Sequence, residues 1–327
     1  MTPRHPSQDP TQASRVSRLS WRRLRGLHFH ALIVLAIALT WWLVLQRIAL
    51  ERQQVLAAAM QSSAKLAAAY EQQVDRTLKA AEQVAAFVRE QYLRQGRALP
   101  LSAWVKQGVI RESMFTIISV VDERGEIVSS SQVTGRVNYA DRDFFRLQAE
   151  SREDVLFVSA PVLGRVSGRW QVPMSLRITR RDGSFGGVVV LSVDPGNFTA
   201  FYGEADLGTR GLLELTGMDG VVRARKIGRE NRFGMDARRL PWFQRQLAQS
   251  QDVFLDEGQE VDGVARLVGH RRMDAYPLMV VVGSTVEDAL APVLQRHQRY
   301  LVWAAGISVL LLVLAAVLLT RTRRPAA

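Results

Sequence analysis

Residues 115–131 read FTIISVVDERGEIVSSS. Residues 115–121 are apolar and rich in β-branched side chains, which is typical of a buried strand. Residues 122–125 have the composition of a turn, and residues 126–131 return as a second strand. The pattern predicts a β-hairpin, the first of several β segments that follow Pro100.

Short apolar segments of the same kind recur along the chain and are bounded by turn residues such as Asp182-Gly183. They predict strands over residues 156–162, 169–179, 187–193, 212–215, 221–225, 265–271 and 279–284.

Two spacings indicate that the arrangement occurs twice. Gly220, in the turn of a second hairpin, lies 95 residues after Gly125, and the Val-Val-Val run at 280–282 lies 92 residues after that at 188–190. We interpret the agreement as a tandem duplication, with coincidence between two generic hairpins as the alternative. Each unit should contain a helix, a hairpin, a helical insert and three strands, so the fold class is α+β. The second unit is expected to be shorter and to lack the Arg-aromatic segment described below.

A long helix is predicted before the β segments. No Pro or Gly occurs between Leu45 and Gly96, and apolar residues recur there at spacings of three and four, interrupted only at Glu71. We expect this stripe to pack on the domain or on a second copy of itself in a homodimer. It consists of Met60, Ala64, Ala67, Val74, Leu78, Ala81, Ala85, Val88 and Tyr92.

Two stretches are apolar enough to cross a membrane. Residues 29–45 and 300–320 contain no Asp, Glu, Lys or Arg, and each is close to the roughly 20 residues that span a bilayer. A cleaved signal peptide is the alternative for the first stretch, but Gln46 and Arg47 follow it without a small-residue cleavage site. The Arg22-Arg23 pair also permits a twin-arginine signal.

The positive charge gathers at the two ends of the chain. Of the formal net charge of +12, the N-terminal tail carries +5 and the C-terminal tail +3. Positive flanks remain in the cytoplasm, so we expect both ends inside and the intervening region outside. Charge placed at membrane flanks argues against nucleic-acid binding. The tail arginines are Arg4, Arg15, Arg18, Arg22, Arg23, Arg25, Arg321, Arg323 and Arg324, against one acid, Asp9.

Signatures of catalysis and of metal binding are missing from the sequence. There is no nucleophile elbow, phosphate-binding Gly loop or His-Glu-x-x-His motif, and the chain has five His and no Cys. We therefore expect no catalytic residues, no metal and no cofactor.

The most unusual cluster is residues 138–145, NYADRDFF. An Arg guanidinium such as that of Arg142 can hold a carboxylate through two hydrogen bonds, and flanking aromatics can wall a small pocket. The alternative is a helix start with Asp141 as cap, Phe144 and Phe145 in the core and Arg142 paired to a local acid. Trp170 either contacts the ligand or is a core or rim residue of its hairpin. Asp194 either receives an ammonium group or caps the Pro195-Gly196 turn.

These patterns together resemble the double Cache (PDC, PAS-like) sensor domains of bacterial receptors, especially those of diguanylate cyclases and histidine kinases. The resemblance covers about residues 50–298 and rests on residues 139–145 (YADRDFF), 159–164 (SAPVLG), 167–173 (SGRWQVP) and 186–194 (GGVVVLSVD).

The resemblance implies a small-molecule site in the first unit. In the amino-acid-binding subgroup an Arg-x-Trp-Tyr segment, a strand Tyr and a later Asp hold the ligand. Arg142 and Asp194 match the Arg and the Asp, Phe144 and Phe145 replace the Trp and Tyr, and the strand Tyr is replaced near Val162. A carboxylate or amino-acid-like ligand is implied. The candidate ligand-binding residues are Tyr139, Arg142, Asp143, Phe144, Phe145, Ser159, Trp170 and Asp194.

The chain is thus predicted to be a sensor of the bacterial inner membrane with a periplasmic ligand-binding domain. Family members continue into an output domain, so we expect either a truncated input half of a diguanylate cyclase or histidine kinase, or signalling through a cytoplasmic or membrane partner. A membrane-anchored periplasmic scaffold for a partner protein is the alternative. The predicted segments are a cytoplasmic tail (1–28), a first transmembrane helix (29–48), the double Cache domain (49–298; long helix 50–95, membrane-distal unit 96–200, membrane-proximal unit 201–298), a second transmembrane helix (299–320) and a short tail (321–327).

Overall fold

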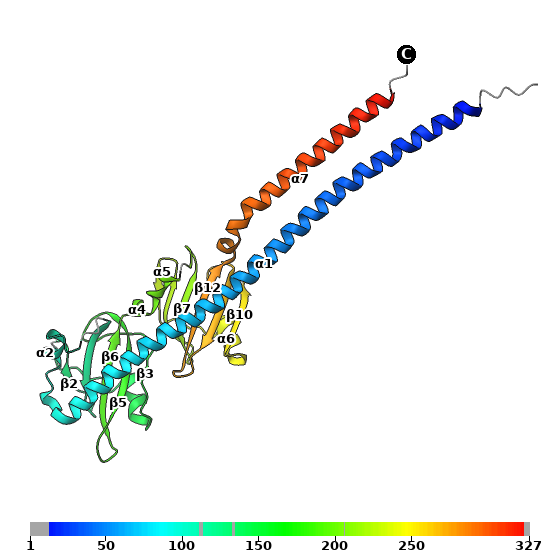
Figure 1. The fold of residues 1–327 in the computed structure, drawn as a ribbon. Helices are drawn as coiled ribbons and strands as arrows, with labels where there is room; N and C mark the ends of the chain where they lie inside the picture. Colours follow the sequence, from blue (N-terminus) through cyan, green and yellow to red (C-terminus); the bar gives the residue numbers. More distant parts are fainter. Residues whose placement is uncertain (1–12, 111–113, 133–134, 206, 324–327) are drawn as a thin grey trace, which may run out of the picture. The chain divides into compact units, whose positions relative to one another are not determined.

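The structure, a computed structural model, describes residues 13–110, 114–132, 135–205 and 207–323 (Figure 1). Parts of both predicted tails, residues 1–12 and 324–327, lie outside the described residues. The helices are α1 (Ala13–Gln95), the 3₁₀ turn η1 (Gly96–Ala98), α2 (Leu101–Lys106), α3 (Asp143–Glu150), α4 (Pro195–Thr199), α5 (Phe201–Glu204), α6 (Pro241–Ala248) and α7 (Val286–Arg323).

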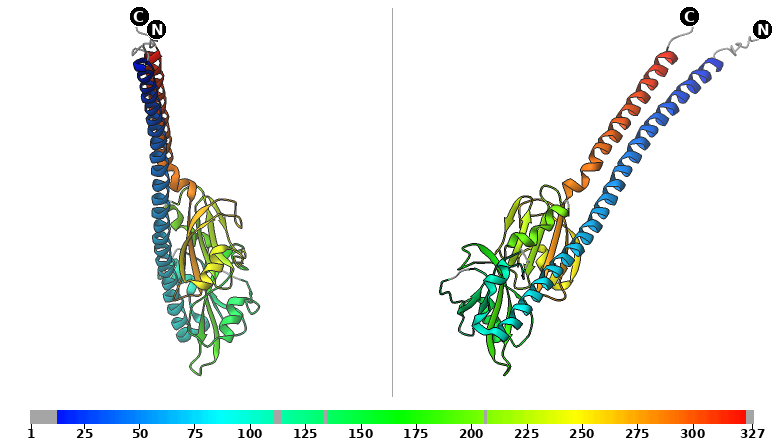
Figure 2. Two further views of the ribbon diagram at one scale, coloured as in Figure 1. Left: turned by 90° about the vertical axis from the view of Figure 1, so that its right-hand side faces the viewer. Right: turned by 60° about the vertical axis from the view of Figure 1, so that its left-hand side comes forward.

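The described chain divides into two bodies, of which one is a pair of helices from the two ends of the sequence. The first part of α1 and most of α7 run alongside each other in each view (Figures 1 and 2). The Tyr300 hydroxyl donates to Glu51 over 3.1 Å, and Trp41 Nε1 donates to the Ser308 hydroxyl over 3.1 Å. By length and composition both helices can cross a membrane, as the sequence predicts.

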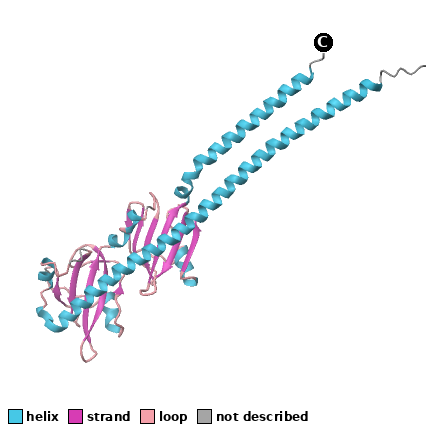
Figure 3. Cartoon of the chain, in the orientation of Figure 1, coloured by secondary structure: helices cyan, strands magenta, loops and turns pink. Residues whose placement is uncertain are grey.

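The other body, residues 57–289, contains two antiparallel sheets, whose strands are magenta in Figure 3. The N-terminal sheet has the order β2-β1-β6-β5-β3, with β4 paired to β5. The predicted strand over residues 115–121 and its return are confirmed. The strands are β1 (Phe115–Val121), β2 (Ile127–Ser130), β3 (Phe157–Val158), β4 (Val162–Leu163), β5 (Trp170–Thr179) and β6 (Phe185–Val193).

The C-terminal sheet has the order β10-β11-β12-β7-β8-β9 and repeats the hairpin, helix and three-strand succession of the first. The predicted α+β class with two tandem PAS-like units is confirmed. The strands of the C-terminal sheet are β7 (Leu212–Gly217), β8 (Val222–Ile227), β9 (Glu230–Arg232), β10 (Gln251–Asp256), β11 (Arg266–Arg272) and β12 (Leu278–Thr285).

Both sheets bury one face under α1, whose predicted continuity is confirmed. Tyr70 belongs to the buried stripe, and its hydroxyl donates to the Phe198 carbonyl over 2.9 Å, whereas Glu71 pairs with Arg271. The prediction that this stripe forms a homodimer is wrong, because the chain's own sheets already cover it. The α1 residues that belong to this buried core are Ala67, Tyr70, Val74, Leu78, Ala81, Ala85 and Val88, none more than 2% exposed.

The predicted single strand over residues 156–162 is two short strands. β3 pairs with residues 174–175 of β5, and β4 pairs with residues 170–171. Pro161 lies between them and has no N–H to donate to the ladder, so the pairing breaks there. β4 and the two residues that follow it, Gly164 and Arg165, form one wall of the site described next.

Candidate functional site

The Tyr139–Phe145 segment is held against the tip of the β1–β2 hairpin. The Tyr139 N–H donates to the Gly125 carbonyl over 2.7 Å, and the Asn138 side chain donates to the Arg124 carbonyl. Gly125 has φ +85°, and a Cβ there would lie 2.5 Å from the Ala140 nitrogen. The turn therefore requires glycine, and it places Arg142 at the start of α3.

A cavity lies between this segment, the sheet face opposite α1, and the residues that follow β4. The sheet contributes alternate residues of β1 and β6, among them Ser119 and Ser192. Its lining residues are Ile117, Ser119, Tyr139, Arg142, Phe144, Val162, Leu163, Gly164, Arg165, Gln171, Val190 and Ser192.

Arg142 crosses the mouth of the cavity from the α3 side. Its Nη2 donates to the Leu163 carbonyl over 3.1 Å, while its buried Nε has no partner among the described residues. Tyr139 packs edge-on against Phe144 with ring centroids 5.4 Å apart. Burial raises the pKa of Tyr139, so its hydroxyl stays protonated and can donate a hydrogen bond.

Arg165 crosses the same mouth in the opposite direction. Its guanidinium makes two hydrogen bonds to the Asp141 carboxylate, over 2.7 and 2.6 Å, and a third to the Asn138 carbonyl. These bonds lower the pKa of Asp141 to about 2. The two arginines thus tie the wall after β4 to the segment before α3, and the enclosed space is about 10 Å³, roughly what one water molecule needs. The cavity is therefore narrow in this structure.

Three of the eight predicted ligand-binding residues, Tyr139, Arg142 and Phe144, line this cavity. Phe145 is buried below it and packs edge-on against Phe185. Asp143 is exposed and pairs with Arg146. Arg142 therefore bonds a carbonyl, not the local acid of the helix-start alternative.

The other three predicted residues lie outside the cavity lining. Ser159 is 2% exposed, and its N–H donates to the Pro173 carbonyl. Trp170 is half exposed, with its ring 5.4 Å from that of Phe233. Asp194 is exposed and accepts a hydrogen bond from the Gly196 N–H as the cap of α4.

Four polar lining residues were not singled out from the sequence. Ser119 and Ser192 each follow an apolar residue by two positions, Ile117 and Val190, which is the alternation that places side chains on one face of a strand. That signal was available. Gln171 and Arg165 come to the site only through the packing of β4 and β5, and no local pattern marks them.

The C-terminal unit allows a direct comparison with the site. Both hairpins have a bulge before the turn, after Val120 and after Leu215, and the Ala237 N–H donates to the Gly220 carbonyl just as that of Tyr139 donates to Gly125. Val190 pairs with Ser119, and Val281 pairs with Glu214 at the equivalent place of the second sheet. The two valines are therefore equivalent, and they lie 91 residues apart, not 92 as the sequence comparison assumes. The offset matters because a shift of one residue changes the face of the sheet.

The expectation that the second unit lacks the Arg-aromatic segment holds for the arginine but not for the aromatic residues. Residues 236–243 wrap over the second hairpin as residues 138–145 wrap over the first. Leu240 takes the place of Arg142, and Trp242 takes that of Phe144. The sequence hides the correspondence because the charged residue at its centre is apolar in the second copy.

A buried ion pair fills the position of the cavity in the C-terminal unit. Glu214 stands at the place of Ser119 and Arg225 at that of Ser130. The Glu214 carboxylate is 0% exposed and accepts from Arg225 Nε, from Trp242 Nε1 over 3.0 Å and from the Thr216 hydroxyl. Among the described residues, this ion pair occupies in the C-terminal unit the place that is a cavity in the N-terminal unit.

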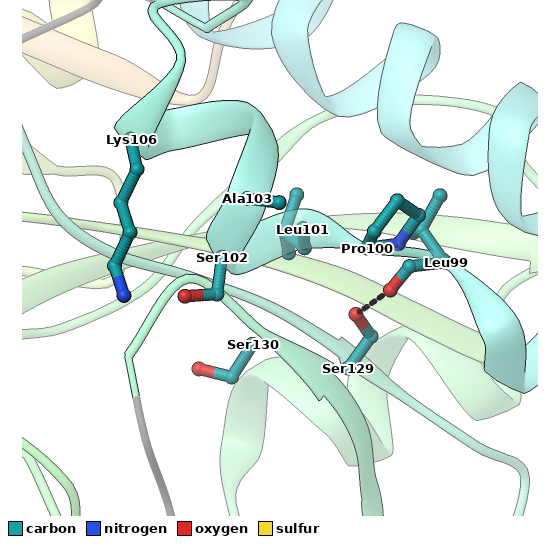
Figure 4. Close-up of a pocket in the computed structure, with 8 residues that line it drawn as sticks. All are labelled: Leu99, Pro100, Leu101, Ser102, Ala103, Lys106, Ser129 and Ser130. Atoms are coloured by element: carbon teal, nitrogen blue, oxygen red, sulfur yellow. Dashed lines mark hydrogen bonds between the residues drawn. The ribbon is translucent and has the colours of Figure 1, made fainter.

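A wider hollow of about 400 Å³ lies on the surface between α2 and the edge strand β2 (Figure 4). The Ser129 hydroxyl at its rim donates to the Leu99 carbonyl, and Ser102, Ser130 and Lys106 supply its other polar groups. It contains none of the predicted site residues. Among the described residues, no group of three or more His, Asp or Glu side chains is placed to hold a metal ion.

Comparison with known proteins agrees with this architecture. Residues 195–283 match the family dCache_1_like, described as a histidine kinase sensor domain. No curated protein sequence matches the chain.

Many solved structures are similar to this chain, including the following three. The extracellular domain of rpHK1S-Z16, described as a histidine kinase, is 24% identical with a TM-score of 0.64 and covers 72% of this chain and 98% of its own. The ligand-binding domain of Mlp24 with asparagine is 14% identical with a TM-score of 0.51 and covers 74% and 98%. The ligand-binding domain of the Pseudomonas fluorescens chemoreceptor CtaA, in complex with L-alanine, is 12% identical with a TM-score of 0.50 and covers 68% and 94%.

The fold is Cache-like, with two PAS-like units in tandem, as the sequence pattern predicts. Two helices that are apolar enough to span a membrane flank this domain, and its C-terminal unit is the part that matches the histidine kinase sensor family.

Proposed function

We propose that this chain is a membrane-bound sensor that binds a small molecule in the cavity of its N-terminal unit. One observation carries the proposal: the same place in the fold is filled by side chains in one unit and is a cavity in the other. The C-terminal unit fills its place with Glu214, Arg225 and Trp242, whereas the N-terminal unit has a cavity lined by two Arg, a Tyr, a Gln and two Ser. Pockets with a few convergent polar groups are typical of small-ligand sites.

The proposal places the sensor domain in the periplasm and the two apolar helices in the inner membrane. It is supported by the arginines at both ends of the chain, which favour the cytoplasm. α1 is one helix from Ala13 to Gln95, so a displacement of the N-terminal unit can be passed along a continuous element. Transmission requires that the ligand bind one conformation more tightly than the other.

In this proposal the sensor domain has no catalytic activity, and the output comes from a kinase or cyclase domain or from a partner protein. The match of the C-terminal unit to a histidine kinase sensor family supports an output of that type. Signalling as a homodimer is part of the same proposal, through a surface other than the buried stripe of α1.

The test is a thermal-shift screen of the full chain in detergent against amino acids, organic acids and amines. Amino acids belong in the screen because Mlp24 and CtaA were solved with asparagine and L-alanine. A hit should be lost in Arg142→Gln and kept in Arg146→Gln, since Arg146 is exposed, pairs with Asp143 and lies outside the cavity. A hit that survives Arg142→Gln would move the site elsewhere, and a broad library without any hit would favour a protein-binding scaffold.

A further inference from the structure

The charged side chains that line the cavity are both positive. Arg142 and Arg165 line it, and the remaining polar lining comes from Tyr139, Gln171 and two Ser residues. No Asp or Glu is among the lining residues that the structure describes. A ligand enclosed here would meet two guanidinium groups and several hydroxyls, and no carboxylate.

The acidic side chains near the site already have partners in the chain. Asp141 is exposed, is not a lining residue and pairs with Arg165, and Asp143 pairs with Arg146. Asp194, which the sequence offered as the partner of an ammonium group, caps α4 through the Gly196 N–H. An ammonium group buried in this cavity would have no carboxylate opposite it, which is costly in a site closed to water.

The two arginines are arranged to exchange partners. Each reaches across the mouth to the opposite wall: Arg142 to the Leu163 carbonyl, and Arg165 to Asp141. A ligand carboxylate can replace the neutral carbonyl on Arg142 with a charge-assisted, two-bond contact. On Arg165 the ligand carboxylate would replace the exposed carboxylate of Asp141, which pairs with the same guanidinium.

From this geometry, and resting on the proposed function, we infer that the N-terminal unit senses small carboxylates that lack an amino group, held by Arg142 and Arg165. Asp141 acts as an internal competitor that keeps the mouth closed until the ligand carboxylate displaces it. Arg165 is thus a specificity-determining residue of the site. A short dicarboxylate can engage both guanidinium groups at once.

The test compares matched pairs of ligands that differ in the amino group, namely succinate with L-aspartate and L-lactate with L-alanine. Binding to the full chain in detergent is measured by calorimetry in a buffer free of carboxylates. In at least one pair, we expect the acid without an amino group to bind at least roughly tenfold more tightly than the amino acid. The difference reflects the cost of leaving a buried ammonium group without a charged partner.

Variants separate the two arginines from a general loss of folding. Arg165→Gln should weaken binding of the acid roughly tenfold, and Arg146→Gln should leave it unchanged. Asp141→Ala should strengthen it by roughly two- to fivefold, as expected for removal of an exposed ion pair. A gain in affinity cannot arise from misfolding.

The outcomes distinguish this inference from the proposed function. Tighter binding of the amino acids, or no gain in Asp141→Ala, overturns the inference and leaves a ligand-binding sensor in place. Absence of binding by all four probes also overturns it. The proposed function itself fails only if no small molecule binds in an Arg142-dependent way.

Discussion

The buried ion pair of the C-terminal unit gives a quantitative test of the fold. Arg225 and Glu214 have side chains 7% and 0% exposed, and the carboxylate also accepts from Trp242 and Thr216. Arg225→Met removes the positive partner and leaves the buried carboxylate uncompensated. The expected loss in the free energy of unfolding is about 3–5 kcal/mol. At about 2–4 °C per kcal/mol for a body of this size, the melting temperature should fall by about 6–20 °C.

A second variant decides whether the loss comes from the unpaired charge. Glu214→Gln keeps an acceptor for Trp242 and Thr216 but carries no charge. The double variant with Arg225→Met should therefore recover at least half of the loss. Arg232→Met is the matched control, because its pair with Glu230 is exposed, and it should change stability by less than about 0.5 kcal/mol.

The assay is thermal unfolding of the full chain in detergent, followed by intrinsic fluorescence and circular dichroism. The reasoning is refuted if Arg225→Met costs no more than Arg232→Met, or if the double variant is as unstable as Arg225→Met alone. Either result would mean that water reaches Glu214 and that the position is not a filled site.

The remaining predictions concern other parts of residues 57–289. Burial lowers the pKa of His270, so the unfolded chain binds a proton that the folded chain does not. Its stabilising contribution is complete above about pH 6.5 and is lost as the pH falls below that value, and His270→Gln should flatten the melting temperature between pH 7 and 5. Gly125→Ala should lower the free energy of unfolding by over about 1 kcal/mol more than Gly183→Ala does. Both glycines have positive φ, but only at Gly125 would a Cβ collide with a neighbouring residue, Ala140. Chemical denaturation measures the difference. Leu78→Ala should destabilise the chain by about 2–5 kcal/mol without changing the oligomeric state seen in light scattering, and a changed state would return the α1 stripe to a dimer interface.

Local patterns were sufficient for most of the secondary structure. The strand over residues 115–121 and the uninterrupted helix up to residue 95 follow from β-branched runs, turn residues and the absence of Pro and Gly. The same patterns showed that the chain contains two similar units. These features depend on neighbours within a few residues, so the sequence expresses them directly.

The site was only partly accessible from the sequence. Tyr139, Arg142 and Phe144 could be proposed because they lie together in one unusual segment. Arg165 could not, since its role depends on Asp141, which lies 24 residues earlier, and on the way β4 and β5 pack. Asp194 was available for two roles, and the nearby Gly196 N–H decided for the cap.

The sequence by itself determined that two β units, a long helix and two apolar helices exist in this chain. Tertiary structure alone decided which unit keeps a cavity. Ser119 and Glu214 occupy equivalent strand positions, and neither residue shows from its local sequence whether a partner will meet it across the sheet. Arg225 and Trp242 reach Glu214 only after the hairpin and α6 have folded over that face, and their contact with it is what closes the second site.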